Sequence, residues 1–170
     1  TKSAEQGYAR GQSNLGVMYE YGNGVTKDYK KAVEWITKAA EQGYAPGQSN
    51  LGIMYQNGHG VTKDYKKAFE WYTKAAEQGD ASGQCNLGVM YDRGNGVTKD
   101  DKKALEWYTK SAEQGYARGQ CNLGYMYRNG HGVTKDNKKA VEWYTKAAEQ
   151  GYAPGQNNLG YMYENGDGVT

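Results

Sequence analysis

The chain has 170 residues, of which 25 are Gly and 17 are Tyr, and 21 Lys and Arg stand against 19 Asp and Glu. The resulting net charge of +2 argues against nucleic-acid binding or a membrane-surface role, because both normally require a clustered basic excess. No apolar run approaches the roughly 20 residues that a bilayer-spanning helix needs.

A repeat of 36 residues runs through the sequence without an insertion. Its clearest marker is the Trp at positions 35, 71, 107 and 143. A partial copy at 1–27 is followed by full copies at 28–63, 64–99 and 100–135 and a near-complete copy at 136–170. Self-similarity at such a period is the signature of a repeat array, so we expect one solenoid over residues 1–170. Since the first residues align with the inside of a helix, we expect the natural array to be longer.

Each copy predicts two helices, which we call helix A and helix B. Helix A runs from about residue 45 to 56, where Gln48, Leu51, Gly52 and Tyr55 fall on one helical face. The link from helix B to the next helix A, residues 42–44, is so short that successive helices must pack antiparallel.

Helix B runs from about residue 64 to 77, with Asp64 as its expected N-cap. Gly58 and Gly79 follow the two helices, where a left-handed residue is favoured. The link from helix A to helix B is longer and rich in Gly, and we expect Val61 to anchor it to the core.

One run of residues carries a family resemblance and reads LGxMYxxGxGVTKDxKKAxEWYTKAAEQG. It resembles the Sel-one-like repeat (SLR), a relative of the tetratricopeptide repeat. The resemblance implies an all-α, right-handed α/α superhelical solenoid of helix-turn-helix repeats, in which helix A lines a concave groove and the protein serves as a scaffold or adaptor. One departure recurs, because Gly stands where the family usually has Ala at positions 11, 47, 83, 119 and 155.

The copies differ from one another mainly along one stripe of helix A, which we call its varying face. In one copy the varying face consists of Arg118, Cys121, Tyr125, Arg128 and Asn129. Drift of a solvent-exposed surface would explain this variation. However, Tyr and Arg are the residues that dominate binding hot spots, so we favour a partner-binding face that is strongest near Tyr125, Arg128 and Tyr161.

An Asn beside the varying face recurs in every copy. Its amide could bond the backbone of an extended peptide once per repeat, or it could bond within its own repeat or steady the turn between helices; the sequence leaves both open. The candidate partner-binding residues are therefore Asn50, Asn86, Asp92, Arg93, Arg118, Asn122, Tyr125, Arg128, Asn158 and Tyr161.

No residue pattern predicts catalysis, a cofactor or a metal. Cys85 and Cys121 occupy one position of neighbouring repeats, too far apart for a disulfide, so we expect two free thiols. His59 and His131 lie on loops without further ligand residues, which predicts surface histidines.

These observations favour a non-catalytic adaptor that binds a protein or peptide partner, with no role in binding nucleic acid or membranes. The alternative is a structural spacer, or an array that self-associates end to end through its uncapped edges. Near-identical copies favour the spacer, whereas variation confined to one face favours the adaptor.

Overall fold

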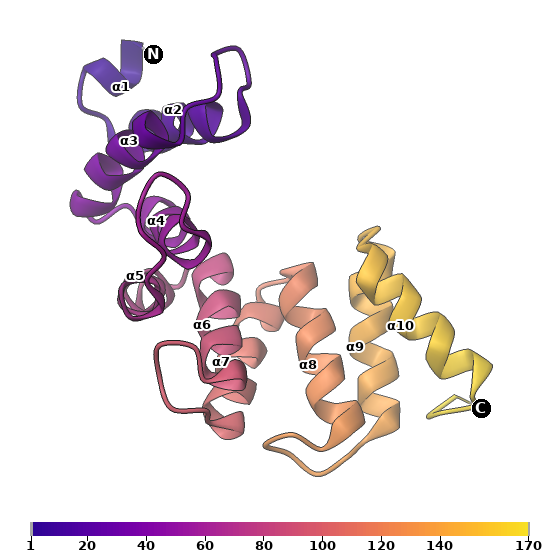
Figure 1. Cartoon of the computed structure of the whole chain (residues 1–170). Coiled ribbons are helices and arrows are strands. Elements are labelled where there is room, and N and C mark those ends of the chain that lie inside the picture. The colour runs from indigo at the N-terminus through magenta and orange to yellow at the C-terminus, as the bar shows by residue number, and fades with distance from the viewer. Residues whose placement is uncertain (1, 170) are drawn as a thin grey trace. The chain divides into compact units, whose positions relative to one another are not determined.

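The computed structural model describes residues 2–169, and this part of the chain is built from α-helices without any strand (Figure 1). The helices are α1 (Lys2–Glu5), α2 (Ala9–Tyr21), α3 (Tyr29–Glu41), α4 (Ala45–Asn57), α5 (Tyr65–Glu77), α6 (Ala81–Arg93), α7 (Asp101–Glu113), α8 (Ala117–Asn129), α9 (Asn137–Glu149) and α10 (Ala153–Glu164). Even-numbered helices are copies of helix A, and α3, α5, α7 and α9 are copies of helix B. The all-α, repeat-built fold class is confirmed.

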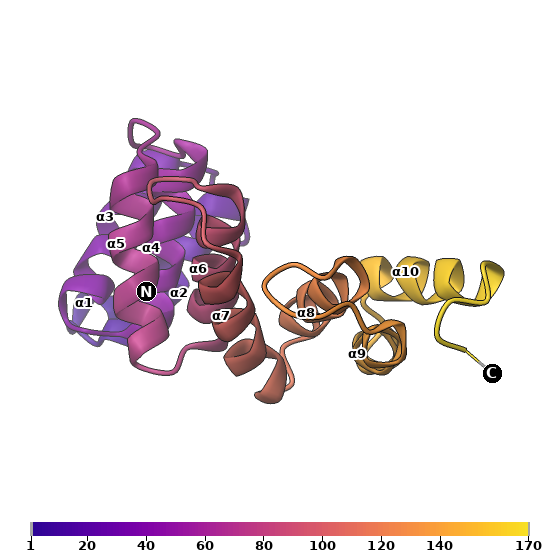
Figure 2. The same ribbon diagram turned by 90° about the horizontal axis from the view of Figure 1, so that it is seen from below.

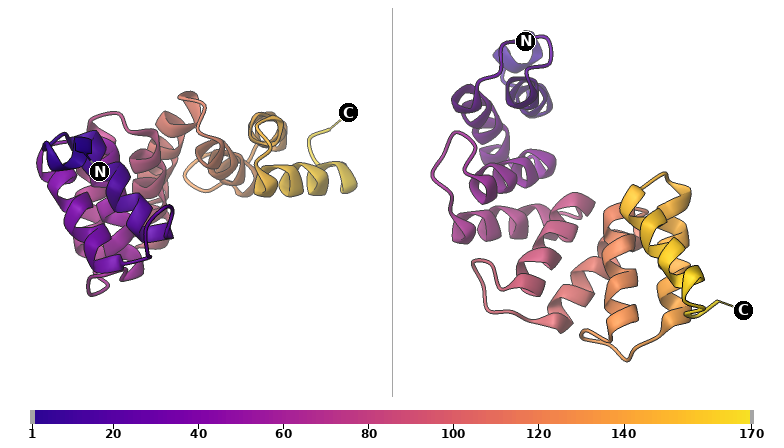
Figure 3. Two further views of the ribbon diagram at one scale, coloured as in Figure 1. Left: turned by 90° about the horizontal axis from the view of Figure 1, so that it is seen from above. Right: turned by 45° about the vertical axis from the view of Figure 1, so that its right-hand side comes forward.

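The chain divides into two compact units, with a boundary inside α6. Unit 1 comprises the residues up to Asn86 together with Asn95–Val97, and unit 2 comprises Leu87–Gly94 together with the residues from Thr98 onward. In unit 1, each helix from α2 to α5 packs on the next (Figure 2). In unit 2, α8, α9 and α10 lie side by side (Figure 3, right). Neighbouring copies of helix A also make contact: α2 contacts α4, and α8 contacts α10.

The helix ends follow the predicted signals. Asp64 immediately precedes α5, and its Oδ1 accepts hydrogen bonds from the backbone amides of Lys66 and Lys67, both at 3.0 Å. Gly58 ends α4 with a left-handed backbone at φ +74°. Three residues separate α3 from α4, as expected. The capping residues and the links between helices are therefore as the sequence predicts.

The core of each unit is made of small and aromatic side chains from facing helices. In unit 1, Ile36 and Leu51 belong to one buried cluster, and Val61 of the connecting loop packs against it as predicted. In unit 2, Tyr144 takes the place of Ile36 and lies fully buried beside Cys121. The Trp rings are only half-buried at the rim, where a Lys lies over each of them, for example Lys38 at 4.3 Å from the centroid of Trp35.

The unchanging glycines allow close helix contact. A Cβ atom on Gly88 would lie 2.6 Å from Cδ1 of Tyr108, so the ring fits only against glycine. At the start of helix A, a Cβ atom on Gly83 would lie 2.7 Å from Cβ of Ala75. This contact gives a physical reason for the glycines that replace the family's usual alanine, because they let the start of helix A approach the end of the preceding helix B.

Candidate partner-binding site

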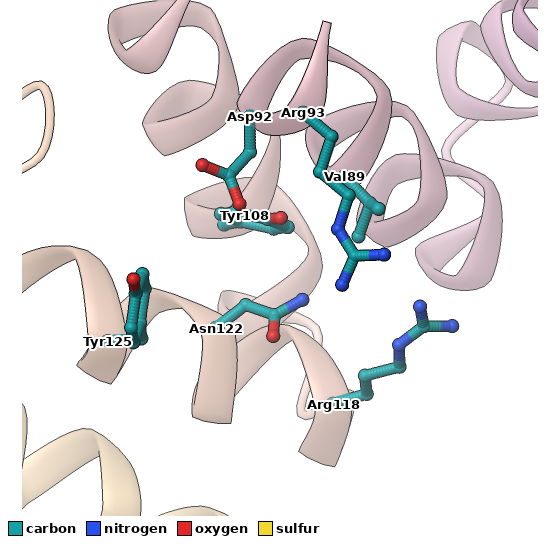
Figure 4. A pocket seen from close by; sticks show the side chains of 7 residues that line it. All are labelled: Val89, Asp92, Arg93, Tyr108, Arg118, Asn122 and Tyr125. Atoms are coloured by element: carbon teal, nitrogen blue, oxygen red, sulfur yellow. The ribbon is translucent and has the colours of Figure 1, made fainter. Parts of the chain in front are cut away.

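Half of the predicted site residues gather around one pocket in unit 2. The pocket has a volume of about 370 Å³ and is lined by Val89, Asp92, Arg93, Tyr108, Arg118, Asn122 and Tyr125 (Figure 4). Its walls come from the C-terminal half of α6, from α7 and from α8. The pocket falls within the 300–1,000 Å³ range that is common for ligand sites.

The two arginine side chains of the pocket converge. Arg93 reaches down from α6 and Arg118 up from α8, and the amide of Asn122 points into the space beside them (Figure 4). The carboxylate of Asp92 instead points toward Tyr108, at some distance from the two guanidinium groups (Figure 4). The polar ends therefore separate into a cationic side and an acidic side.

The aromatic ring of Tyr125 forms the other wall of the pocket. Its side chain is 43% exposed, and it contacts the ring of His131 edge-on with 5.5 Å between the centroids. Val89 is the equivalent residue one repeat earlier and is almost fully buried. An apolar surface thus adjoins the arginine pair.

A second pair of predicted residues meets next to the pocket-lining helix α8. The guanidinium carbon of Arg128 lies 4.1 Å from the ring centroid of Tyr161 on α10, a cation–π contact. Tyr161 is 45% exposed. Arg128 and Tyr161 do not line the pocket, but they continue the varying face of helix A within unit 2.

The recurring Asn side chains bond to the neighbouring repeat. Asn50 donates from Nδ2 to Oγ of Ser13 at 3.3 Å, and Asn158 donates from Nδ2 to Sγ of Cys121 at 3.4 Å. Each bond joins one helix A to the preceding helix A. The sequence left open a peptide-binding role and a structural role within one repeat or its turn. The observed bonds join two repeats and give these two Asn side chains a structural task. Asn50 and Asn86 belong to unit 1, and Asn86 is buried.

Part of the varying face is also explained by contacts between repeats. In unit 1, Nδ1 of His59 lies 3.4 Å from Oε1 of Glu20, and its ring stacks on Tyr29 with 4.4 Å between centroids. Three repeats further on, at the positions of Tyr29 and His59, Nδ2 of Asn137 donates to Oδ1 of Asp167 at 3.1 Å. His59 is therefore half-buried rather than a plain surface residue, and Glu20 has a partner in the loop of the next repeat.

Two pocket residues, Val89 and Tyr108, were missed as site candidates. Tyr108 is only 2% exposed, yet it is one of the residues that line the pocket. Val89 occupies the same repeat position as Tyr125 and Tyr161. That shared position was the one feature of the sequence that could have indicated it. An aliphatic side chain at this position does not by itself indicate a binding site.

The two cysteines of the described residues form no disulfide. Cys85 and Cys121 keep separate thiols, as predicted, and both are buried. Burial raises the pKa of the Cys121 thiol, and the hydrogen bond from Asn158 only partly opposes it. Among residues 2–169, no group of three or more His, Cys, Asp and Glu side chains is arranged to hold a metal ion. None of the described helices has the length and apolar character needed to cross a membrane.

Comparison with solved structures finds close likenesses. The chain is 49% identical to a protective antigen of uropathogenic Escherichia coli with an SLR fold, at a TM-score of 0.88 over 99% of this chain and 36% of that one. It is 38% identical to a Sel1 repeat protein of Oxalobacter formigenes, at a TM-score of 0.92 over 99% of this chain and 67% of that one. It is 32% identical to the cysteine-rich protein B of Helicobacter pylori, at a TM-score of 0.61 over 81% of this chain and 99% of that one.

The chain thus spans about a third of the length of the Escherichia coli antigen. A comparison with curated protein sequences found no match. The model of the Sel1 repeat matches residues 9–44, 45–80, 81–116, 117–152 and 153–170, which is the same period counted from helix A instead of helix B. Proteins of this family are in general scaffolds for protein interaction. Because the repeats tile nearly the whole sequence, this chain belongs to the Sel1 repeat family.

Proposed function

We propose that this chain is a non-catalytic scaffold that holds a peptide or protein partner on the varying face of helix A, with the pocket of unit 2 as its main anchor. The observation that carries the proposal is the gathering of Asp92, Arg93, Arg118, Asn122 and Tyr125 around one pocket. Four of these residues differ between copies, and Asn122 is the Asn that recurs in every copy. The pocket brings them together from two neighbouring copies of helix A.

The character of the varying face in unit 2 supports the same proposal. At the position of Tyr125 and Tyr161, unit 1 carries Val17 and Ile53, which are half-buried aliphatic residues. The two tyrosines are exposed, and one of them is stacked with an arginine. Rigid aromatic and arginine side chains on a preformed surface lose little conformational entropy on binding, so Tyr125, Arg128 and Tyr161 are suited to recognition.

A random peptide library displayed on phage tests the proposal. The library is panned on the immobilised chain and on a variant with Tyr125→Ala, Arg128→Glu and Tyr161→Ala. We expect peptides that bind the wild type and lose about thirtyfold or more in affinity on the variant, since hot-spot residues contribute about 2 kcal/mol or more each.

The control variant carries Lys66→Glu and Lys102→Glu, two exposed positions on the outer side of helix B. It changes surface charge and leaves the varying face intact, so it should keep wild-type binding. Circular dichroism verifies that both variants retain the helical signal. Equal binding by all three proteins, or no enriched peptide at all, would contradict the proposed function.

The spacer alternative has one observation in its favour. The copies are nearly identical along the helix faces that pack on one another. An array of such copies could stack on a second copy of the chain. Light scattering over a dilution series tests this: a mass that rises with concentration supports end-to-end association, and a constant monomer mass removes it.

A further inference from the structure

We infer that the pocket of unit 2 binds the carboxylate of an Asp or Glu side chain within an extended peptide segment. This inference rests on the proposed function and specifies the chemistry of the partner. The ligand's carboxylate would lie between Arg93 and Arg118, and the neighbouring peptide residue would contact Tyr125 and Val89.

The charge of the pocket is the first argument. Its lining contains two arginines and one aspartate, and the aspartate points toward Tyr108 rather than toward the arginines (Figure 4). Arg93 is exposed and forms no ion pair with any described residue. The space between the guanidinium groups is therefore positive and complementary to an anion.

The shape of the donors is the second argument. A guanidinium group is planar and offers parallel N–H donors that match the two oxygens of a carboxylate. Arg93 and Arg118 approach the same space from different helices, and the Asn122 side chain reaches it from one turn further along α8 (Figure 4). An oxyanion between them could accept hydrogen bonds from more than one side.

The pocket also offers contacts to the part of the ligand beyond its carboxylate. The pocket is about 370 Å³ in volume and opens beside the exposed ring of Tyr125. Val89 and this ring offer apolar contact within the same lining. An acidic residue next to an apolar residue uses both parts of the surface, whereas a free anion would use only the arginines.

Asp92 favours a singly charged carboxylate over a phosphate group. A phosphate carries close to two negative charges at neutral pH, and like charges at short range are unfavourable. The chain as a whole also carries a net charge of only +2, which gives little general attraction to polyanions. These features favour an acidic peptide over nucleic acid or a phosphorylated segment.

The test uses the full chain and peptides enriched from the displayed library. We expect Asp or Glu, followed or preceded by an apolar residue, to be enriched among them. In fluorescence anisotropy, the change of that acidic residue to Gln or Asn should weaken binding about tenfold or more, as should Arg93→Gln together with Arg118→Gln, because a charge-assisted hydrogen bond contributes about 1.5–3 kcal/mol.

The matched control is Lys102→Gln together with Lys138→Gln, which removes the same charge from exposed positions on α7 and α9 of unit 2. It should leave the affinity within about twofold, because both lysines lie outside the pocket. An equal loss in the control would mean that general electrostatics caused the effect, and would overturn the inference.

Further arms separate the sources of the anion. Amidation of the peptide C-terminus should not change binding, and a phosphoserine version should bind no more tightly than the acidic peptide. The opposite result in either arm would overturn the assignment to an acidic side chain. Enriched peptides without acidic residues would overturn this inference alone, whereas a library that yields no binders would overturn the proposed function as well.

Discussion

Tyr144 lies at the centre of the core of unit 2, where no part of its side chain is exposed. Burial raises its pKa from 10.0 to about 12; the nearby Cys121 adds to this rise, and the positive charge of Arg128 opposes it. An unfolded chain loses this proton at a lower pH than the folded chain. The contribution of Tyr144 to the free energy of unfolding is therefore fully present below pH 10, and it is lost as the pH rises toward 12.

The variant Tyr144→Phe tests this pH dependence. Without the hydroxyl, the free energy of unfolding should fall less steeply between pH 9 and about pH 11 than in the wild type. Tyr163→Phe is the control, because Tyr163 is 60% exposed. The measurement is urea unfolding followed by circular dichroism at several pH values. Parallel pH profiles for wild type and Tyr144→Phe would contradict the account.

The side-chain contacts between repeats could not be predicted from the sequence. The Asn at position 50 carried no sign that its partner was Ser13, because one copy of a repeat does not reveal which side chain of the preceding copy it meets. The same holds for His59 and Glu20, which look unrelated in the sequence and meet only when repeats stack. Contacts within one copy were predictable, and contacts between copies were not.

The packing of helix A on helix B leaves no room for a side chain at the glycine of the Leu-Gly pair in α2, α4, α6 and α8. A Cβ atom on Gly124 would lie 2.8 Å from both Cδ1 and Cε1 of Tyr144. The same atom on Gly160 would meet nothing within 4 Å. The two positions share one sequence context and differ in their packing, so they form a matched pair.

We therefore expect opposite effects from the same substitution. Gly124→Ala should lower the free energy of unfolding, since overpacking costs about 1–3 kcal/mol and the better helix propensity of alanine returns only about 1 kcal/mol. Gly160→Ala should leave stability unchanged or raise it by up to about 1 kcal/mol. Denaturant unfolding of both variants measures the two changes. A Gly124→Ala variant as stable as the wild type would contradict the prediction and show that the ring of Tyr144 moves aside.

The helices themselves were predicted well because their signals are local. The N-cap Asp64, the helix-ending Gly58 and the short link at 42–44 each act within a few residues, and the observed bounds of α4 and α5 differ from the predicted ones by one residue. The close approach of helix A to the preceding helix B, at Gly83, depends instead on the distance between two helices. That distance is set by packing and is not visible in the helical periodicity.

Across the whole chain, the repeats keep one set of residues for packing and vary another. The packing set builds the cores of both units, and the varying face carries exposed tyrosines in both, Tyr21 in unit 1 and Tyr125 and Tyr161 in unit 2. The sequence could predict which residues were free to vary. It could not predict that four of them border one pocket, since that requires the side chains of α6 and α8 to face each other.

The most direct test of the account is a titration of the isotope-labelled chain with a peptide enriched from the library, followed through backbone amide resonances. We expect the largest shifts at Arg93, Arg118, Asn122 and Tyr125, and no change at the outer positions Lys66 and Lys102. Shifts centred on the outer side of helix B, with the pocket residues unaffected, would contradict this expectation.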